Sequence, residues 1–191
     1  MILDPLLFTR TCKRRGFFDW LFFDSRFQIL YTLYVTNEYF TEAVVLDKEP
    51  SGEFDSIVYL YTKELGKVSA RVTSARKIIS KLNSHLEPLN LIQVRLVEKN
   101  RFHVADVLRT GALDCKHLDA LNLIKSITPE AQPDPELWQL IKTNLNEKDI
   151  LRILGFDSQF AACLGCGLKN DLRFSINDLS YFCVGCYDRL S

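Results

Sequence analysis

Four cysteines near the C-terminal end stand in two pairs with the spacing of a metal site. Cys163 and Cys166 form one C-x2-C pair, Cys183 and Cys186 form a second, and sixteen residues separate the pairs. This spacing lies in the range of four-cysteine zinc sites. Two thiolates two residues apart grip one ion from a tight turn, and two such turns complete a tetrahedron. We therefore predict one bound Zn²⁺.

The predicted zinc is structural, because four cysteine ligands leave no position for an activated water. The short segments 172–175 and 181–182 are strand-like, which predicts a zinc ribbon over residues 161–191. The alternative is a redox C-x-x-C pair, which would follow a strand in a βαβ unit. The sequence has two pairs and no such pattern. The cysteines are not spread as in a secreted disulfide scaffold, so we expect a reducing cytoplasm and no disulfides.

Residues 41–110 alternate as β-strands do. In the segment 67–73, Val68, Ala70 and Val72 fall on one face, and a basic and polar set falls on the other. Five such strands in about seventy residues suit a small closed barrel such as the OB fold. An SH3-like barrel would give much the same pattern. A turn signal at 49–52 is predicted to end the first strand.

Residues 111–160 change to a helical period, so the predicted fold class is α+β, with a barrel, a small helical domain and the zinc ribbon. Asp134 and Asn146 are expected to cap two of the helices, and Gly155 to end the last. Residues 1–40 form an aromatic N-terminal extension whose charges argue against a membrane span. It is either a docking helix or the product of a start codon assigned too far upstream, and we favour the second.

The formal net charge is zero, so attraction to a polyanion requires an uneven distribution of charge. Residues 63–81 carry six Lys or Arg and a single Glu, partly on the outer side of one predicted strand. Barrels of this kind bind nucleic acid on such a face. Tyr59 and Tyr61 suit the core at least as well as base stacking, and we leave them out. The predicted nucleic-acid contacts are Lys67, Arg71, Arg76, Lys77 and Lys81.

No catalytic residue is predicted. His85, His103 and His117 stand apart in the sequence, and no nucleophile motif or pair of carboxylates accompanies them. We therefore expect a binding protein rather than an enzyme.

Several segments, in order, resemble the bacterial recombination mediator family RecO, a family of DNA repair proteins. The segments 53–58 (EFDSIV) and 61–67 (YTKELGK) are similar to its first block, and 74–77 (SARK) with 86–89 (LEPL) to its second. The segment 151–156 (LRILGF), leading into Cys163, resembles the approach to the zinc module of many members.

The resemblance implies an OB fold, binding of single- and double-stranded DNA, and annealing of complementary strands. It also implies RecR and single-stranded DNA-binding protein as partners in loading a recombinase, in the cytoplasm and associated with the nucleoid. Members are usually longer, with helices after the second cysteine pair, so we expect a shortened member.

Two other hypotheses remain open. One is a zinc-ribbon interaction module in transcription or translation, with weak and non-specific affinity for DNA. The other is a thiol oxidoreductase that uses a C-x-x-C pair and holds little metal.

Overall fold

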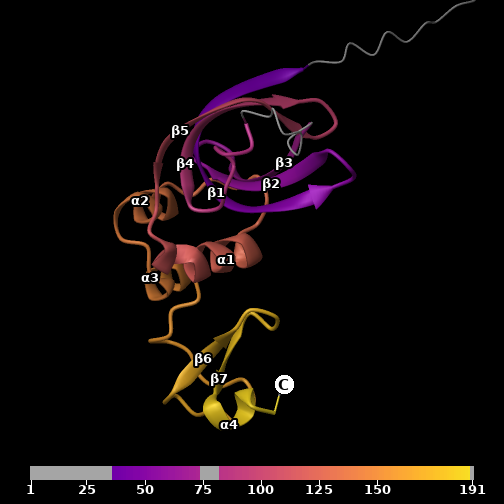
Figure 1. Cartoon of the computed structure of the whole chain (residues 1–191). Helices are drawn as coiled ribbons and strands as arrows, with labels where there is room; N and C mark the ends of the chain where they lie inside the picture. Colours follow the sequence, from indigo (N-terminus) through magenta and orange to yellow (C-terminus); the bar gives the residue numbers. More distant parts are fainter. Residues whose placement is uncertain (1–35, 74–81, 190–191) are drawn as a thin grey trace, which may run out of the picture. The chain divides into compact units, whose positions relative to one another are not determined.

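The computed structural model describes residues 36–73 and 82–189. Their first part is a closed barrel with the strand order β1-β2-β3-β5-β4, drawn in indigo to rose in Figure 1. This barrel confirms the predicted OB fold and the α+β class. The strands are β1 (Asn37–Ser51), β2 (Asp55–Thr62), β3 (Gly66–Val72), β4 (Asn90–Glu98) and β5 (Phe102–Ala112).

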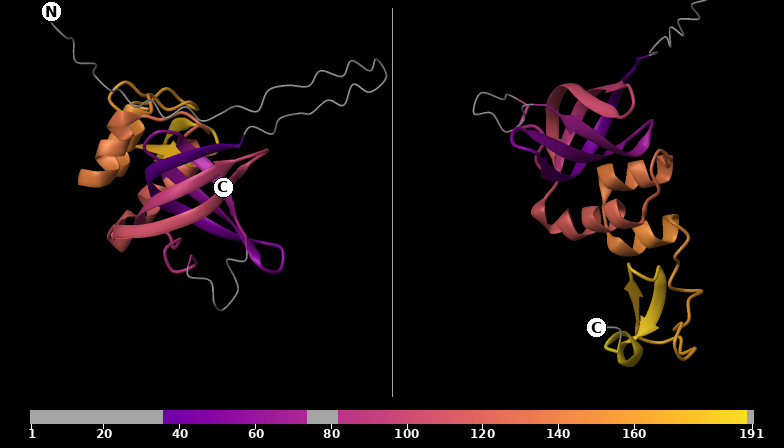
Figure 2. Two further views of the ribbon diagram at one scale, coloured as in Figure 1. Left: turned by 90° about the horizontal axis from the view of Figure 1, so that it is seen from above. Right: turned by 90° about the vertical axis from the view of Figure 1, so that its right-hand side faces the viewer.

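Alternation along the strands fills the barrel, whose winding can be followed in the two views of Figure 2. Val68, Ala70 and Val72 of β3 are buried as predicted. Short parallel pairing between β3 and β5, Ala70 opposite Phe102 and Arg71 opposite His103, closes the barrel. The other strand pairs are antiparallel. The barrel core therefore contains side chains from all five strands.

The first strand is longer than its turn signal predicts. Pro50 lies within β1 opposite Ser56, and Ser51 lies opposite Asp55. The predicted turn at 49–52 was therefore wrong, because the chain turns after Ser51. Proline is tolerated here because β4 pairs only with the first half of β1, residues 37–44, so no ladder bond to β4 is lost at Pro50.

Four short helical segments follow the barrel, and the predicted caps are confirmed. Oδ1 of Asp134 accepts hydrogen bonds from two backbone N–H groups, and Oδ1 of Asn146 accepts one from Asp149. Among the described residues, no helix is both long and apolar enough to cross a membrane. The segments are η1 (Cys115–His117), α1 (Leu118–Ile127), α2 (Pro135–Thr143) and α3 (Glu147–Ile153).

The helices share a second core with the outer side of the barrel. Val44 and Leu46 of β1 and Tyr61 of β2 are buried in it, together with side chains of α1, α2 and α3. Two features differ from the sequence pattern. Leu118 begins the apolar stripe of α1 but is 42% exposed, and Cys115 is exposed although isolated cysteines are usually buried.

A lysine on α1 fastens this helix to β1. Nζ of Lys125 lies 2.6 Å from Oδ2 of Asp47 and 2.8 Å from Oε1 of Glu49. The same ammonium group lies 4.2 Å from the centre of the Tyr59 ring. Two ion pairs and one cation–π contact therefore meet at a single side chain.

The C-terminal module consists of β6 (Leu172–Ser175), β7 (Ser180–Cys183) and α4 (Val184–Tyr187). β6 and β7 pair as the predicted hairpin, coloured yellow in Figure 1. Phe174 lies 5.1 Å from Phe156 and 5.2 Å from Tyr181, measured between ring centres. The Tyr181 hydroxyl donates a hydrogen bond of 2.8 Å to the carbonyl of Phe156. These contacts join the hairpin to the residues that follow α3.

Gly66 is the residue in the barrel that tolerates a side chain least. Its φ is +67°, and an added Cβ would lie 2.2 Å from the carbonyl oxygen of Gln132, which is backbone. We predict that Gly66→Ala lowers the free energy of unfolding by about 3 kcal/mol or more, from backbone strain plus overlap. Urea unfolding monitored by circular dichroism measures this loss.

Gly52→Ala is the matched control. Gly52 has a φ of +74°, but nothing lies within 4 Å of the position of its added Cβ. In this variant only the left-handed backbone conformation lowers the free energy of unfolding, by about 1–2 kcal/mol. Equal losses in the two variants would show that the contact with Gln132 has no effect on stability.

Candidate functional site

The four cysteines converge on one point in the C-terminal module. Cys163 and Cys166 come from the loop before β6, Cys183 ends β7, and Cys186 lies in α4. Their four sulfur atoms all lie within 4.8 Å of one another. The Sγ atoms of Cys166 and Cys183 are 3.6 Å apart. A tetrahedron with metal–sulfur bonds of about 2.3 Å has edges of ~3.8 Å, so the cluster fits a metal ion.

Backbone N–H groups turn towards the sulfurs and favour the thiolate form. Hydrogen bonding from the N–H of Cys183, assisted by those of Cys166 and Gly165, lowers the pKa of Cys163 to about 6. Hydrogen bonds with Cys183, Cys163 and Cys166 raise the pKa of Cys186 to about 12. Four sulfurs this close cannot all ionise without a compensating cation. A bound metal would supply that positive charge.

The backbone passes so close to the cysteine sulfurs that one position near the cluster favours glycine. A Cβ added to Gly165 would lie 3.1 Å from the sulfur of Cys186. The N–H of Gly167 donates to the carbonyl of Cys163 at 2.8 Å, and the N–H of Cys163 donates to the carbonyl of Leu168 at 2.7 Å. These bonds fold the first cysteine pair into a closed turn.

A second candidate site lies around the end of β3, beside residues that follow two loops of the barrel. The loop between β1 and β2 continues into Asp55, whose carboxylate accepts hydrogen bonds from Arg71 at 3.0 and 2.5 Å. The loop between β4 and β5 leads into Phe102 and His103, which pair with β3. In OB folds, these two loops and the face of strands 2 and 3 bind oligonucleotides.

The two predicted nucleic-acid contacts that the structure describes have different surroundings. Arg71 lies between the two loops, in its pair with Asp55. Nζ of Lys67 instead donates a hydrogen bond of 2.8 Å to the carbonyl of Lys125, near the end of α1, and burial lowers the pKa of Lys67. The remaining three lie outside the described residues: Arg76, Lys77 and Lys81.

The two tyrosines left out of the prediction pack against the helices. Tyr61 is 1% exposed, and its hydroxyl accepts a hydrogen bond from the N–H of Asp134 at 3.1 Å. Tyr59 lies under the Lys125 ammonium group and donates a hydrogen bond to Glu49. Neither ring offers an open face for a base.

Three exposed side chains of the two loops escaped the sequence analysis. Phe54, 52% exposed, lies between β1 and β2, and Lys99 and Arg101 lie in the turn between β4 and β5. An aromatic ring and two cations suit a single strand, through stacking and phosphate attraction. Their place in the loops of a five-stranded barrel was the available signal, and the prediction followed the run of basic residues at 63–81 instead.

The structure is a closed OB barrel that is followed by short helices and a four-cysteine module. These features define the class of the protein: an OB-barrel protein with an additional metal-binding module. Comparison of the sequence with protein families agrees with this class. Residues 37–110 match the family described as "Recombination protein O N terminal". The matched segment spans the barrel from the first residue of β1 to Thr110, close to the end of β5.

Curated relatives extend the match beyond the barrel. The chain is 30% identical over 165 residues to the DNA repair protein RecO of Thermodesulfovibrio yellowstonii, covering 72% of this chain and 66% of the relative. It is 26% identical to that of Alkaliphilus metalliredigens, covering 77% and 71%, and 25% identical to that of Bacillus pumilus, covering 78% and 68%. The chain thus spans about two thirds of the length of these relatives, and it belongs to the RecO family.

The metal cluster gives a direct prediction. We expect the wild-type chain to hold one metal ion and Cys166→Ser to lose it, because a tetrahedral site with three thiolates binds more weakly. Native mass spectrometry of protein purified without chelator measures the ratio of metal to protein.

Cys115→Ser is the matched control, since Cys115 is exposed and lies outside the cluster. This variant is expected to keep the full ratio. One ion per chain in both variants would argue that Cys166 is not a ligand.

Proposed function

We propose that this chain is a DNA-binding recombination mediator that acts in DNA repair. The observation that carries the proposal is the match of residues 37–110 to the RecO N-terminal family, over a segment that folds as an OB barrel. The curated relatives are named as DNA repair proteins. OB barrels are a common module for binding oligonucleotides, which supports nucleic acid as the ligand.

The proposed DNA site is built around the end of β3. Phe54 supplies a stacking surface, and Lys99 and Arg101 supply phosphate contacts from the opposite loop. Arg71 lies between them, and its side chain is 42% exposed despite the ion pair with Asp55. A phosphate can therefore approach Arg71 on its solvent side.

Three basic residues that follow β3 in the sequence lie outside the described residues. We propose Arg76, Lys77 and Lys81 as further phosphate contacts of this site. Lys67 is left out of the proposed site because its ammonium group is already bonded to the end of α1.

The four-cysteine cluster is proposed to bind Zn²⁺ with a structural role. Four thiolates in a tetrahedron suit zinc, and they leave no position open for water. The convergence of all four sulfurs favours this role over a redox pair, which needs only two. The zinc would hold α4 and β7 against the loop before β6.

The finer functions are proposals that follow from the family. DNA bound along a cationic face carries fewer counterions, and the repulsion between two complementary strands falls, which favours annealing. We propose that the chain binds single- and double-stranded DNA, anneals strands and assists recombinase loading with RecR, without catalytic turnover. Single-stranded DNA-binding protein is a further proposed partner, at the nucleoid.

One observation favours a second function, a protein-interaction module. Ten large hydrophobic side chains are exposed among the described residues, and six of them lie between residues 160 and 184. Clustered exposure of this kind often marks a binding surface. The six are Phe160, Leu164, Leu168, Ile176, Leu179 and Val184.

The proposed DNA site is tested by the salt dependence of binding. On a single strand, each phosphate contact contributes about 0.7 unit to the slope of log Kd against log salt concentration. We expect the double variant Lys99→Ala/Arg101→Ala to bind a labelled thirty-nucleotide single strand more weakly and to lower the slope by about 1.4 units. Fluorescence anisotropy at several salt concentrations measures both.

Lys148→Ala is the control, because Lys148 is exposed on α3 and away from both loops. It should leave the slope unchanged. If the double variant also keeps the wild-type slope, the loops do not contact phosphates. Weak binding by the wild type at every salt concentration would favour the interaction module.

A further inference from the structure

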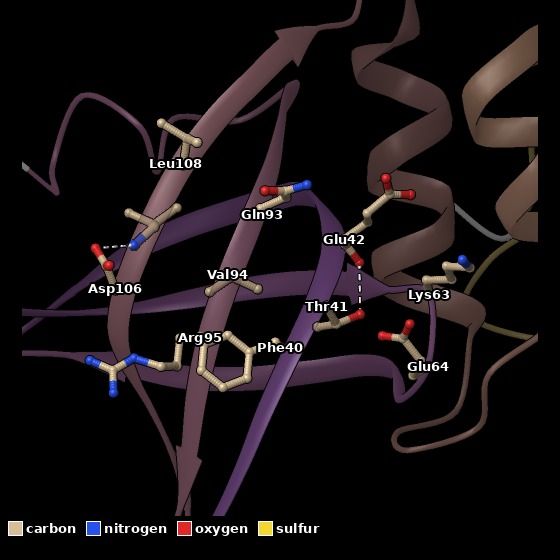
Figure 3. Close-up of a pocket in the computed structure, with 11 residues that line it drawn as sticks. Phe40, Thr41, Glu42, Lys63, Glu64, Gln93, Val94, Arg95, Asp106 and Leu108 are labelled. Carbon is tan, nitrogen blue, oxygen red and sulfur yellow. Dashed lines mark hydrogen bonds between the residues drawn. The ribbon is translucent and has the colours of Figure 1, made fainter.

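An open groove crosses the outer face of β1, β4 and β5, the strands that do not form the usual oligonucleotide face of an OB fold. Its volume is about 540 Å³, within the range of binding pockets for small ligands and peptide side chains. Figure 3 shows the side chains that line it: those of β4 in the middle, those of β5 on one flank, and Phe40 and Glu42 of β1 on the other. We call it the β1–β4–β5 groove.

Strand register arranges the groove as two rows of three side chains. Phe40, Arg95 and Asp106 lie opposite one another across the three strands. Glu42, Gln93 and Leu108 form the next row, two residues further along each strand. The two apolar residues occupy diagonal corners, and the two carboxylates occupy the other two. With strands ~4.8 Å apart and rows ~6.8 Å apart, the apolar corners are separated by ~12 Å.

The apolar corners are open to solvent. Phe40 is 73% exposed and Leu108 is 59% exposed. Among the described residues of the barrel strands, Phe40 and Leu108 are the large hydrophobic side chains that are exposed. Both lie on the groove face. An exposed aromatic ring with a polar rim is a common arrangement at the centre of protein–protein contacts.

The charges in the groove decide what kind of partner fits. Glu42 pairs with Lys142 at 3.1 Å, and Arg95 pairs with Glu38 at 3.5 Å, so these charges are largely compensated. The other charged lining residues are one cation, Lys63, and two carboxylates, Glu64 and Asp106. Within the described part of the chain, none of these three forms an ion pair, which leaves the groove with one excess negative charge.

A nucleic-acid strand is therefore poorly suited to this groove. Its phosphates would lie near Glu64 and Asp106, of which Lys63 can offset only one, and like charges in contact weaken association. A cationic side chain would instead compensate Asp106 or Glu64, while an apolar side chain covers Phe40 or Leu108.

We propose that the β1–β4–β5 groove is a docking site for an extended protein segment that presents apolar side chains and lysine or arginine on the same face. The segment crosses β4 on the diagonal from Phe40 to Leu108. An extended strand covers this distance in about four residues, so apolar side chains four apart, on the same face of the segment, reach both corners. This site is independent of the proposed DNA site, because it uses other strands and the opposite sign of charge.

The test uses a fluorescein-labelled peptide, Lys-Ser-Phe-Ser-Lys-Ser-Leu-Ser-Lys, and the full chain. Its Phe and Leu are four residues apart, and its lysines lie on the same face of the extended peptide as these two. We expect binding that Phe40→Ala and Asp106→Lys each weaken by about tenfold or more, as at a contact centre. Two matched controls should change the affinity by less than about twofold. Phe160→Ala removes a ring that is 87% exposed elsewhere, and Glu53→Lys makes the same charge change in the loop between β1 and β2.

Other results overturn the proposal. Equal weakening by each variant and its matched control would mean that the peptide binds through general charge or hydrophobicity. The proposal is also overturned if the peptide Glu-Ser-Phe-Ser-Glu-Ser-Leu-Ser-Glu binds equally well, or if neither peptide binds. Loss of oligonucleotide binding in Phe40→Ala, measured with thirty thymidines, would reassign the groove to nucleic acid. Unchanged thermal unfolding of all four variants excludes a folding defect as the cause.

Discussion

Burial of β1 on both of its faces is the constraint on which the rest of the structure depends. Ala43 and Val45 point into the barrel, while Val44 and Leu46 point into the core shared with the helices. Each fully buried Val or Leu contributes roughly 1.5–3 kcal/mol, so this run of four residues links two cores with several kcal/mol. The apolar sequence at 43–46, which shows no alternation, follows directly from this position. The Lys125 ion pairs and the Tyr61 hydroxyl add polar contacts across the same boundary.

Local signals account for most of the fold that the sequence predicted. Alternation in β3 and β4 identified the inward side chains, and capping chemistry placed the starts of α2 and α3. The cysteine spacing predicted a cluster because its geometry is set within two tight turns. The turn after β1 was misplaced because Pro50 and Gly52 signal a turn equally well, and only the pairing with β2 decides between them.

Long-range contacts could not be predicted. Lys67 and Arg71 share one alternating strand, yet the partner of Lys67 is 58 residues away and that of Arg71 is 16 residues away. The sequence therefore showed a basic face but not which cations are engaged within the fold. The β1–β4–β5 groove was invisible for the same reason, because its rows need the register of three strands. The division of the chain at residues 110 and 160 into separate domains stays a prediction.

Two surfaces are proposed on one barrel, a cationic DNA site at the end of β3 and a groove with an excess of carboxylates on β1, β4 and β5. Nuclear magnetic resonance distinguishes them, through backbone amide shifts of the labelled chain on addition of a thirty-nucleotide single strand. We expect the largest shifts at Phe54, Arg71, Lys99 and Arg101. Shifts centred on Phe40 and Leu108, or none at saturating DNA, would contradict the proposed DNA site.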